Sequence, residues 1–177
     1  MVQAYFKRRR FEVITIMKLY IKGEKINIKP INGDSINMVK YWYGESDSYR
    51  FATGRKKAED VLKICPDSFV SGIYTENETI IGLIIGELKK IRETVLWIRT
   101  FLIDTAWQRK QYGTYSFNLL CKHASEHLNV KRVYLSVSEE NKAGISFWRK
   151  MGMSCIKTLE INDSENNSGV FIFEKVL

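Results

Sequence analysis

A polar turn at residues 108–114, with the sequence QRKQYGT, carries groups suited to a negatively charged ligand. The apolar stretch before it predicts a strand over 94–104, and the helical spacing of apolar residues after it predicts a helix over 113–128. Unpaired N–H groups at a helix N-terminus favour an anion. Arg109 and Lys110 add positive charge, and Gly113 permits close approach to the backbone. The turn is therefore predicted to hold a pyrophosphate.

Two carboxylates are candidates for proton transfer. Glu87 lies in an otherwise apolar segment predicted as a central strand, and Asp104 ends the strand before the polar turn. A carboxylate in such a position can act as a general base, and its commoner role is an ion pair with a neighbouring Lys or Arg. Both interpretations stay open from the sequence.

A pair of histidines could bind a metal ion. His123 and His127 stand four residues apart on the predicted helix, so both could face one ion. Glu126 does not fit the HExxH arrangement, and the sequence holds no further cluster of ligands. An exposed helix face explains the pair better, and no metal is predicted.

The segment 43–57 is polar and aromatic without a clear period, which predicts a loop. Glu45 and Asp47 in it could attract a cationic amine, or could simply be solvated. The aromatic residues in and beside it could line an acceptor cleft or pack in the core: Tyr41, Trp42, Tyr43, Tyr49 and Phe51.

The remaining elements must hold these residues in place. The patterns predict two short strands within 19–31, helices over 36–43 and 57–65, and an antiparallel meander of strands over 68–75, 79–91 and 94–104. A strand over 130–137 should pair parallel to 94–104 through the helix 113–128. Asn141 should cap a helix that ends at Gly152, followed by strands over 153–161 and 170–176 joined by a loop. The expected fold is an α/β (α+β) sandwich with a mixed, mostly antiparallel sheet and one parallel βαβ crossover.

Composition limits the class of protein. With 177 residues, 45% hydrophobic and 27% charged, the chain fits a soluble globular domain, predicted over 25–177 after a basic extension and first strand over 1–24. Three cysteines without a CxxC pair argue against a disulfide framework and favour a reducing cytoplasm. No apolar run approaches the roughly 20 residues of a membrane span.

The net charge of +8 is concentrated near the N-terminus. Residues 1–30 hold eight Lys or Arg and two Glu, a contribution of +6. The basic run at 7–10 could bind RNA, and a solvated terminus is the commoner role of such runs. Met17 could be the biological start, which would place residues 1–16 outside the native protein.

The segments QRKQYG at 108–113 and NKAGISFWRKMGM at 141–153 together resemble the GNAT superfamily of acyl-CoA-dependent N-acyltransferases. The family's loop pattern Q/R-x-x-G-x-G/A is matched by residues 108–113, with Gln111 in place of the first glycine and Gly113 at the second. Gln111 is compatible with the loop if its φ is negative. Downstream, NKAGISFWRKMGM is similar to the family's asparagine, alanine and "FYeklGF" segment, with Asn141, Ala143, Phe147, Lys150, Met151 and Gly152 in register.

The resemblance implies acetyl-CoA as co-substrate and a site for it. The family's sheet splays between the two parallel strands, and the pantetheine arm pairs with the backbone of the first. The cofactor-binding residues implied are Phe101, Leu102, Ile103, Gln108, Arg109, Lys110, Gln111, Tyr112, Gly113, Thr114, Asn141, Phe147 and Trp148.

The resemblance also implies the reaction, N-acetylation of a primary amine on a small molecule or a protein or peptide amino terminus. Trp148 stands where many family members have a tyrosine that acts as the general acid. Either another residue protonates the leaving thiolate here, or the thiolate leaves without protonation. Tyr112, Tyr115 and Tyr134 are the phenols nearby. The alternatives are an acyl-CoA-binding protein with little catalysis and an RNA-associated protein. A homodimer is possible, and no membrane partner is expected.

Overall fold

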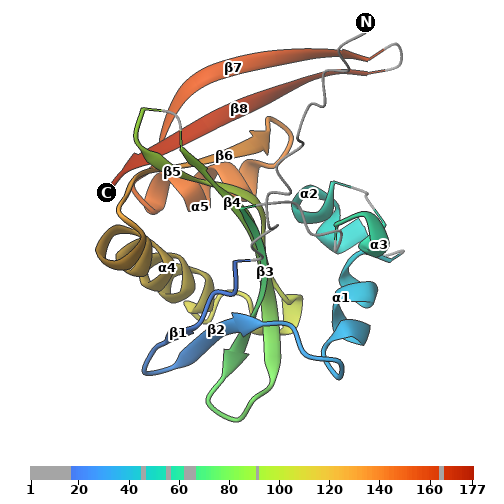
Figure 1. The fold of residues 1–177 in the computed structure, drawn as a ribbon. Helices are drawn as coiled ribbons and strands as arrows, with labels where there is room; N and C mark the ends of the chain where they lie inside the picture. Colours follow the sequence, from blue (N-terminus) through green and yellow to red (C-terminus); the bar gives the residue numbers. More distant parts are fainter. Residues whose placement is uncertain (1–16, 45–46, 55–56, 62–66, 91, 164–165) are drawn as a thin grey trace, which may run out of the picture.

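The computed structural model describes residues 17–44, 47–54, 57–61, 67–90, 92–163 and 166–177. In this part of the chain, eight strands form one sheet in the order β1-β2-β3-β4-β5-β6-β8-β7 (Figure 1). β5 and β6 pair parallel, and the other neighbouring strands pair antiparallel, as the sequence predicts. The strands are β1 Ile21–Lys22, β2 Ile26–Pro30, β3 Ser68–Thr75, β4 Ile80–Lys90, β5 Thr94–Ile103, β6 Val130–Ser138, β7 Ser154–Asp163 and β8 Asn166–Val176.

The helices cover the two faces of the sheet separately. α4 and α5 lie on one side, and α1, α2 and α3 lie on the other (Figure 1). Short 3-10 turns, η1 Asp47–Tyr49 and η2 Thr105–Trp107, precede α2 and α4. The helices are α1 Ile36–Trp42, α2 Arg50–Thr53, α3 Ala58–Val61, α4 Tyr112–Leu128 and α5 Lys142–Lys150.

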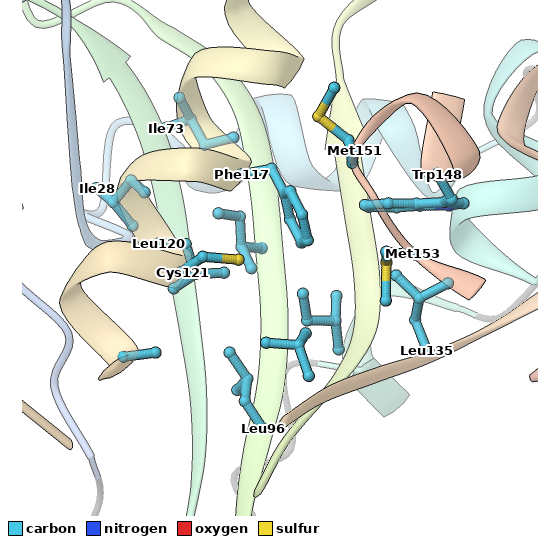
Figure 2. Close-up of a cluster of buried hydrophobic side chains, with 14 of the residues drawn as sticks. Ile28, Ile73, Leu96, Phe117, Leu120, Cys121, Leu135, Trp148, Met151 and Met153 are labelled. Carbon is cyan, nitrogen blue, oxygen red and sulfur yellow. The ribbon is translucent and has the colours of Figure 1, made fainter. Parts of the chain in front are cut away.

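Each helix layer packs its own apolar cluster against the sheet. Figure 2 shows the cluster beneath α4 and α5, where Phe117 and Leu120 of α4 and Trp148 of α5 meet strand residues. A second cluster joins Val39 and Trp42 of α1 to the opposite face of the sheet. Apolar residues on both faces therefore explain the nearly continuous apolar sequence of β4.

β5 and β6 pair over only part of their length. The parallel register runs from Thr94 with Val130 to Ile98 with Leu135 and ends there. On its other side β5 has a bulge against β4, because Gly86 pairs with Ile98 while its neighbour pairs with Thr100. A bulge bends the strand and increases its twist. Beyond Ile98, β5 therefore leaves β6, and β6 continues beside β8.

Three predicted element boundaries differ from the structure. The segment 43–57 was expected as a loop, yet it contains η1 and α2. The helix expected over 57–65 is α3, described from Ala58 to Val61, and residues 62–66 lie outside the described part. The loop expected over 162–169 is wrong, since β7 reaches Asp163 and β8 starts at Asn166.

Several expectations fall outside what the structure describes. The basic run at 7–10 and Cys65 belong to residues that are not described. Among the described residues, no helix is long and apolar enough to span a membrane.

Candidate active site

A pocket of about 780 Å³ opens where β5 and β6 part. Its walls come from the ends of both strands, the turn before α4, the start of α5, and η1 with α2. The predicted cofactor residues that line it are Phe101, Leu102, Ile103, Gln108, Arg109, Gln111, Gly113, Thr114, Asn141, Phe147 and Trp148.

Two predicted cofactor residues do not line this pocket. The Lys110 ammonium donates to the Ala106 carbonyl at 3.0 Å and lies 5.3 Å from the centre of the Trp107 ring. The Tyr112 ring packs edge-on against the same Trp107, with 5.5 Å between ring centres. Both side chains therefore pack around Trp107 and not in the pocket.

The turn before α4 has the features of an anion site. The Gln108 side chain donates to the Ile103 carbonyl at 2.8 Å, which ties the turn to the end of β5. The first helical N–H with a carbonyl partner belongs to Tyr115, which bonds to Gln111 at 3.0 Å. The N–H groups of the first turn lack such an acceptor, as at any helix start. Together with the exposed Arg109, they can bind a phosphate group.

The expected conformation of Gln111 is wrong. Its φ is 65°, in the left-handed region, and Arg109 has a φ of 59°. The chain must reverse between the end of β5 and the start of α4 within a few residues, and that reversal requires positive φ values. Gln111 therefore occupies the position where the family pattern has glycine, and it carries the steric cost of a Cβ there.

Asn141 begins α5 beside the pocket. Its side-chain oxygen accepts from the Gly144 N–H at 2.8 Å, so the predicted N-cap is confirmed. A Cβ on Gly144 would clash with the Asn141 side-chain amide, so a larger residue at 144 would displace this amide from the cap. Gly152 at the other end of α5 has a φ of 77°, the predicted left-handed C-cap.

Aromatic rings form the wall under α5. Phe101 packs edge-on against Trp148 with ring centres 5.3 Å apart, and Phe117 and Phe147 contact the same indole. Trp148 is 7% exposed. Its indole lines the pocket and has no proton suited to a thiolate leaving group.

The two candidate carboxylates do not line the pocket. Glu87 pairs in register with Trp97 and forms an ion pair with Lys89 at 2.8 Å. Asp104 is buried and accepts three hydrogen bonds, from Trp42 at 2.8 Å, Tyr49 at 3.2 Å and the Ala106 N–H at 2.9 Å. Asp104 therefore fastens α1 and η1 to the end of β5.

The phenols named from the sequence point elsewhere. Tyr115 accepts from the Glu24 N–H at 2.9 Å, and Tyr134 donates to Glu174 at 2.6 Å. Tyr49, from η1, lines the pocket, and its hydroxyl also lies 3.1 Å from the Thr105 hydroxyl. Burial raises the pKa of Tyr49, and the hydrogen bonds with Thr105 partly oppose that rise. The phenol therefore keeps its proton at neutral pH.

The other aromatic and acidic residues near 43–57 divide between core and surface. Trp42 and Tyr43 are buried, Tyr41 is exposed, and Phe51 lines the pocket with Tyr49. Asp47 is exposed and lies 3.8 Å from Arg50. Glu45 lies outside the described residues.

Arg99 is a pocket residue that no sequence motif singles out. It is the extra residue of the β5 bulge, it is exposed, and it lines the pocket. Only the register between β4 and β5 locates the bulge, so no local pattern could have singled out this arginine.

The histidine pair stands apart from the pocket. The rings of His123 and His127 lie 4.7 Å apart on α4. Partial burial, and then the neighbouring His127, lower the pKa of His123. Among the residues that the structure describes, no three or more potential ligands gather for a metal ion.

Comparison with known proteins identifies the family. The profile of the acetyltransferase (GNAT) family matches residues 37–153, which is 117 of the 177 residues. The chain belongs to this family. It is therefore an acyltransferase, and the family reaction is acetyl transfer from acetyl-CoA.

Relatives and solved structures agree with that assignment. A spermine/spermidine N(1)-acetyltransferase of Bacillus subtilis (strain 168) is 24% identical over 141 residues, covering 77% of this chain and 93% of the relative. A GNAT-family acetyltransferase from Bacillus anthracis has a TM-score of 0.73 at 15% identity, covering 89% of this chain and 98% of that one. Arabidopsis thaliana NAA60, solved with a bisubstrate analogue, has a TM-score of 0.68 at 16% identity, covering 85% and 97%. The structural similarity supports the GNAT fold.

Proposed function

We propose that this acetyltransferase binds acetyl-CoA in the pocket between β5 and β6 and transfers the acetyl group to a primary amine. The observation that carries the proposal is the parting of the two strands after Ile98 and Leu135, directly beside the turn before α4. The pyrophosphate would lie on the N–H groups of Gly113 and Thr114, near Arg109. The pantetheine arm would follow the free edge of β5 from Phe101 to Ile103.

The proposed chemistry is a direct attack in a ternary complex. The amine must first lose a proton, because only the neutral nitrogen has a lone pair for the thioester carbonyl. The new N–C bond forms as the C–S bond breaks, and the electron pair of that bond leaves with the sulfur. Backbone N–H groups of β5 beyond its pairing with β6 are suited to stabilise the oxyanion.

Tyr49 is our candidate for protonating the thiolate. It is the phenol among the described lining residues, and burial keeps it protonated. Its hydroxyl donates to the buried Asp104 and lies beside the Thr105 hydroxyl, so Tyr49 can protonate the thiolate only when the hydrogen bond to Asp104 opens. Glu87 can act as the base for the amine only if its ion pair with Lys89 opens. Glu140 is the carboxylate among the described residues that line the pocket.

A thiol-release assay across a panel of amines tests the proposal. We expect release of CoA from acetyl-CoA that depends on the amine and rises with pH as the amine loses its proton. Replacing Tyr49 by Phe should lower kcat about ten- to a hundredfold while the affinity for CoA is kept.

A second candidate function is acyl-CoA binding with little catalysis. Trp148 favours it, because this buried indole cannot donate a proton to the leaving thiolate. Tight binding of CoA without turnover of any amine would support this candidate and overturn the enzymatic proposal.

A further inference from the structure

We infer that the acceptor is an amine that also carries an anionic group, a carboxylate or a phosphate, and that Arg99 binds this group. The inference rests on the proposed function, since it names the second substrate of the same pocket. It follows from the position of Arg99, from the lack of an ion pair between it and any described residue, and from the charges around it.

The bulge on β5 determines where Arg99 points. Ile98 pairs with Gly86 and Thr100 pairs with Ile85, so Arg99 has no residue opposite it on β4. It also follows directly after the last residue of β5 that pairs with β6. A bulge at the edge of a split sheet redirects a side chain, and here the side chain that results lines the pocket.

Arg99 lies toward the helix layer opposite the anion turn. Its neighbour Thr100 lies 3.0 Å from the Tyr43 hydroxyl, beside α1. Burial raises the pKa of Tyr43, and the positive charge of Arg99 works against that rise, so the guanidinium lies within electrostatic reach of this phenol. The anion turn begins α4, on the other face of the sheet (Figure 1). The pocket therefore has one cation near its proposed pyrophosphate end and another, Arg99, on the side of α1.

The charge of Arg99 is not neutralised within the described part of the chain. No carboxylate there forms an ion pair with it. Asp104 already accepts three hydrogen bonds, and Asp47 lies 3.8 Å from Arg50. A guanidinium with five donors and no partner is suited to bind a carboxylate or phosphate through two hydrogen bonds.

The charge of Arg99 disfavours a polyamine. The described charged residues that line the pocket are four cations and one anion: Arg99, Arg109, Lys142, Lys150 and Glu140. The phosphates of bound CoA would offset part of this positive charge at the Arg109 end, whereas Arg99 lies on the side of α1. A polyamine would bring further positive charges toward Arg99, whereas an anionic group would compensate it. The acceptor class therefore differs from the polyamines in the name of the Bacillus subtilis relative.

The test compares amines that differ only at the end away from the amino group. Gamma-aminobutyrate, aminopropyl phosphate, butylamine and putrescine present a carboxylate, a phosphate, a methyl and an ammonium group, and shorter and longer homologues of each extend the panel. With acetyl-CoA, we expect kcat/KM for an anionic amine to exceed that for the ammonium-ended amine of similar length by about tenfold or more. The anionic amine with the higher kcat/KM shows whether Arg99 binds a carboxylate or a phosphate.

Substitutions at Arg99 separate its role from that of the cofactor site. Arg99→Gln should lower kcat/KM for anionic amines about ten- to a hundredfold and leave the methyl-ended amine nearly unchanged. Arg99→Glu should turn the preference toward putrescine. The matched control Arg109→Gln should weaken CoA binding and leave the acceptor preference as it is.

A binding measurement keeps this inference separate from the proposed function. Calorimetric binding of the anionic amine to CoA-saturated protein should weaken in Arg99→Gln whether or not turnover occurs. No turnover with any amine, together with that loss of binding, would overturn the proposed function and support the role of Arg99. A preference for putrescine, or anionic amines that bind Arg99→Gln as well as wild type, would overturn the inference.

Discussion

At position 111 a glutamine has a backbone conformation that glycine adopts without steric cost. With φ at 65°, its Cβ lies close to the backbone of the turn, a cost of about 1 kcal/mol. We expect Gln111→Gly to raise the free energy of unfolding by about 1 kcal/mol, less a few tenths for the added freedom of the unfolded chain. Urea denaturation measures the change.

Gln111→Ala is the matched control, because alanine removes the amide but keeps the Cβ. It should leave the stability within about 0.5 kcal/mol of wild type. If alanine stabilises as much as glycine, the strain at this residue is not the cause.

Single residues also show where the sequence was informative. Motif position alone identifies Gln111 as a glutamine in place of a glycine and Trp148 as a tryptophan in place of a tyrosine. The φ of Gln111 could not, because the reversal between β5 and α4 imposes it against the preference of the residue. The roles of Arg99 and Tyr49 depend on contacts between segments distant in sequence, so no local pattern predicts them.

Among the elements, β6 and β8 are joined by a charged cluster on the sheet face. Tyr134 of β6 donates to Glu174 of β8 at 2.6 Å, and Arg132 donates to the same carboxylate oxygen at 3.0 Å. The hydrogen bond from Tyr134, with help from Arg132, holds the pKa of Glu174 below its usual value. The folded state therefore binds a proton at this carboxylate less readily than the unfolded state does.

Because of that difference, the contribution of the cluster to the free energy of unfolding depends on pH. The contribution is full above the pKa of an unfolded glutamate, about 4.3, and is lost as the pH falls through the lower folded pKa. We expect Tyr134→Phe to cost about 1 kcal/mol at pH 7 and progressively less below about pH 4. Urea denaturation of wild type and Tyr134→Phe over a pH series measures this cost.

Tyr115→Phe is the control for this pH dependence. Its hydroxyl accepts from the neutral Glu24 N–H at 2.9 Å, so its cost should not vary over the same pH range. Equal pH profiles for the two variants would contradict the role of Glu174.

Element types were more predictable from the sequence than element lengths. Alternating and helical periods indicated the core strands and α4 because each has one face fixed by burial. The hairpin of β7 and β8 extends further than expected, since Asn162 and Asp163 pair with Asn167 and Asn166 through the backbone, and a run of polar residues gives no alternation to detect. Short helices such as α2 have too few residues for a period to be detected.

On the scale of the whole molecule, the pocket lies between the two layers of helices. Phe101 and Trp148 of its wall belong to the cluster under α4 and α5, while Leu102 belongs to the cluster under α1 and α3. A ligand in the pocket therefore contacts residues of both clusters. Because global unfolding separates these residues, binding and stability are linked.

CoA should therefore stabilise the protein against heat. At about a hundred times its dissociation constant, CoA should add about 2.7 kcal/mol to the free energy of unfolding. For a chain of this size, that corresponds to a rise in Tm of about 5–10 °C, measured by calorimetry. Pantetheine lacks the pyrophosphate, so it should raise Tm less, and added salt should reduce only the effect of CoA.

Variants at Gly113 locate the bound ligand. A Cβ at this position would meet the Phe147 ring at 3.4 Å and Ile103 at 3.6 Å, which are ordinary contacts, so Gly113→Ala should fold normally. Gly113→Val adds bulk beside the N–H groups of the anion turn, so it should remove most of the CoA-induced rise in Tm. Because the unliganded Tm of each variant is measured in the same experiment, loss of binding is separated from loss of stability. A rise with Gly113→Val equal to that of wild type would mean that the pyrophosphate does not lie on this turn.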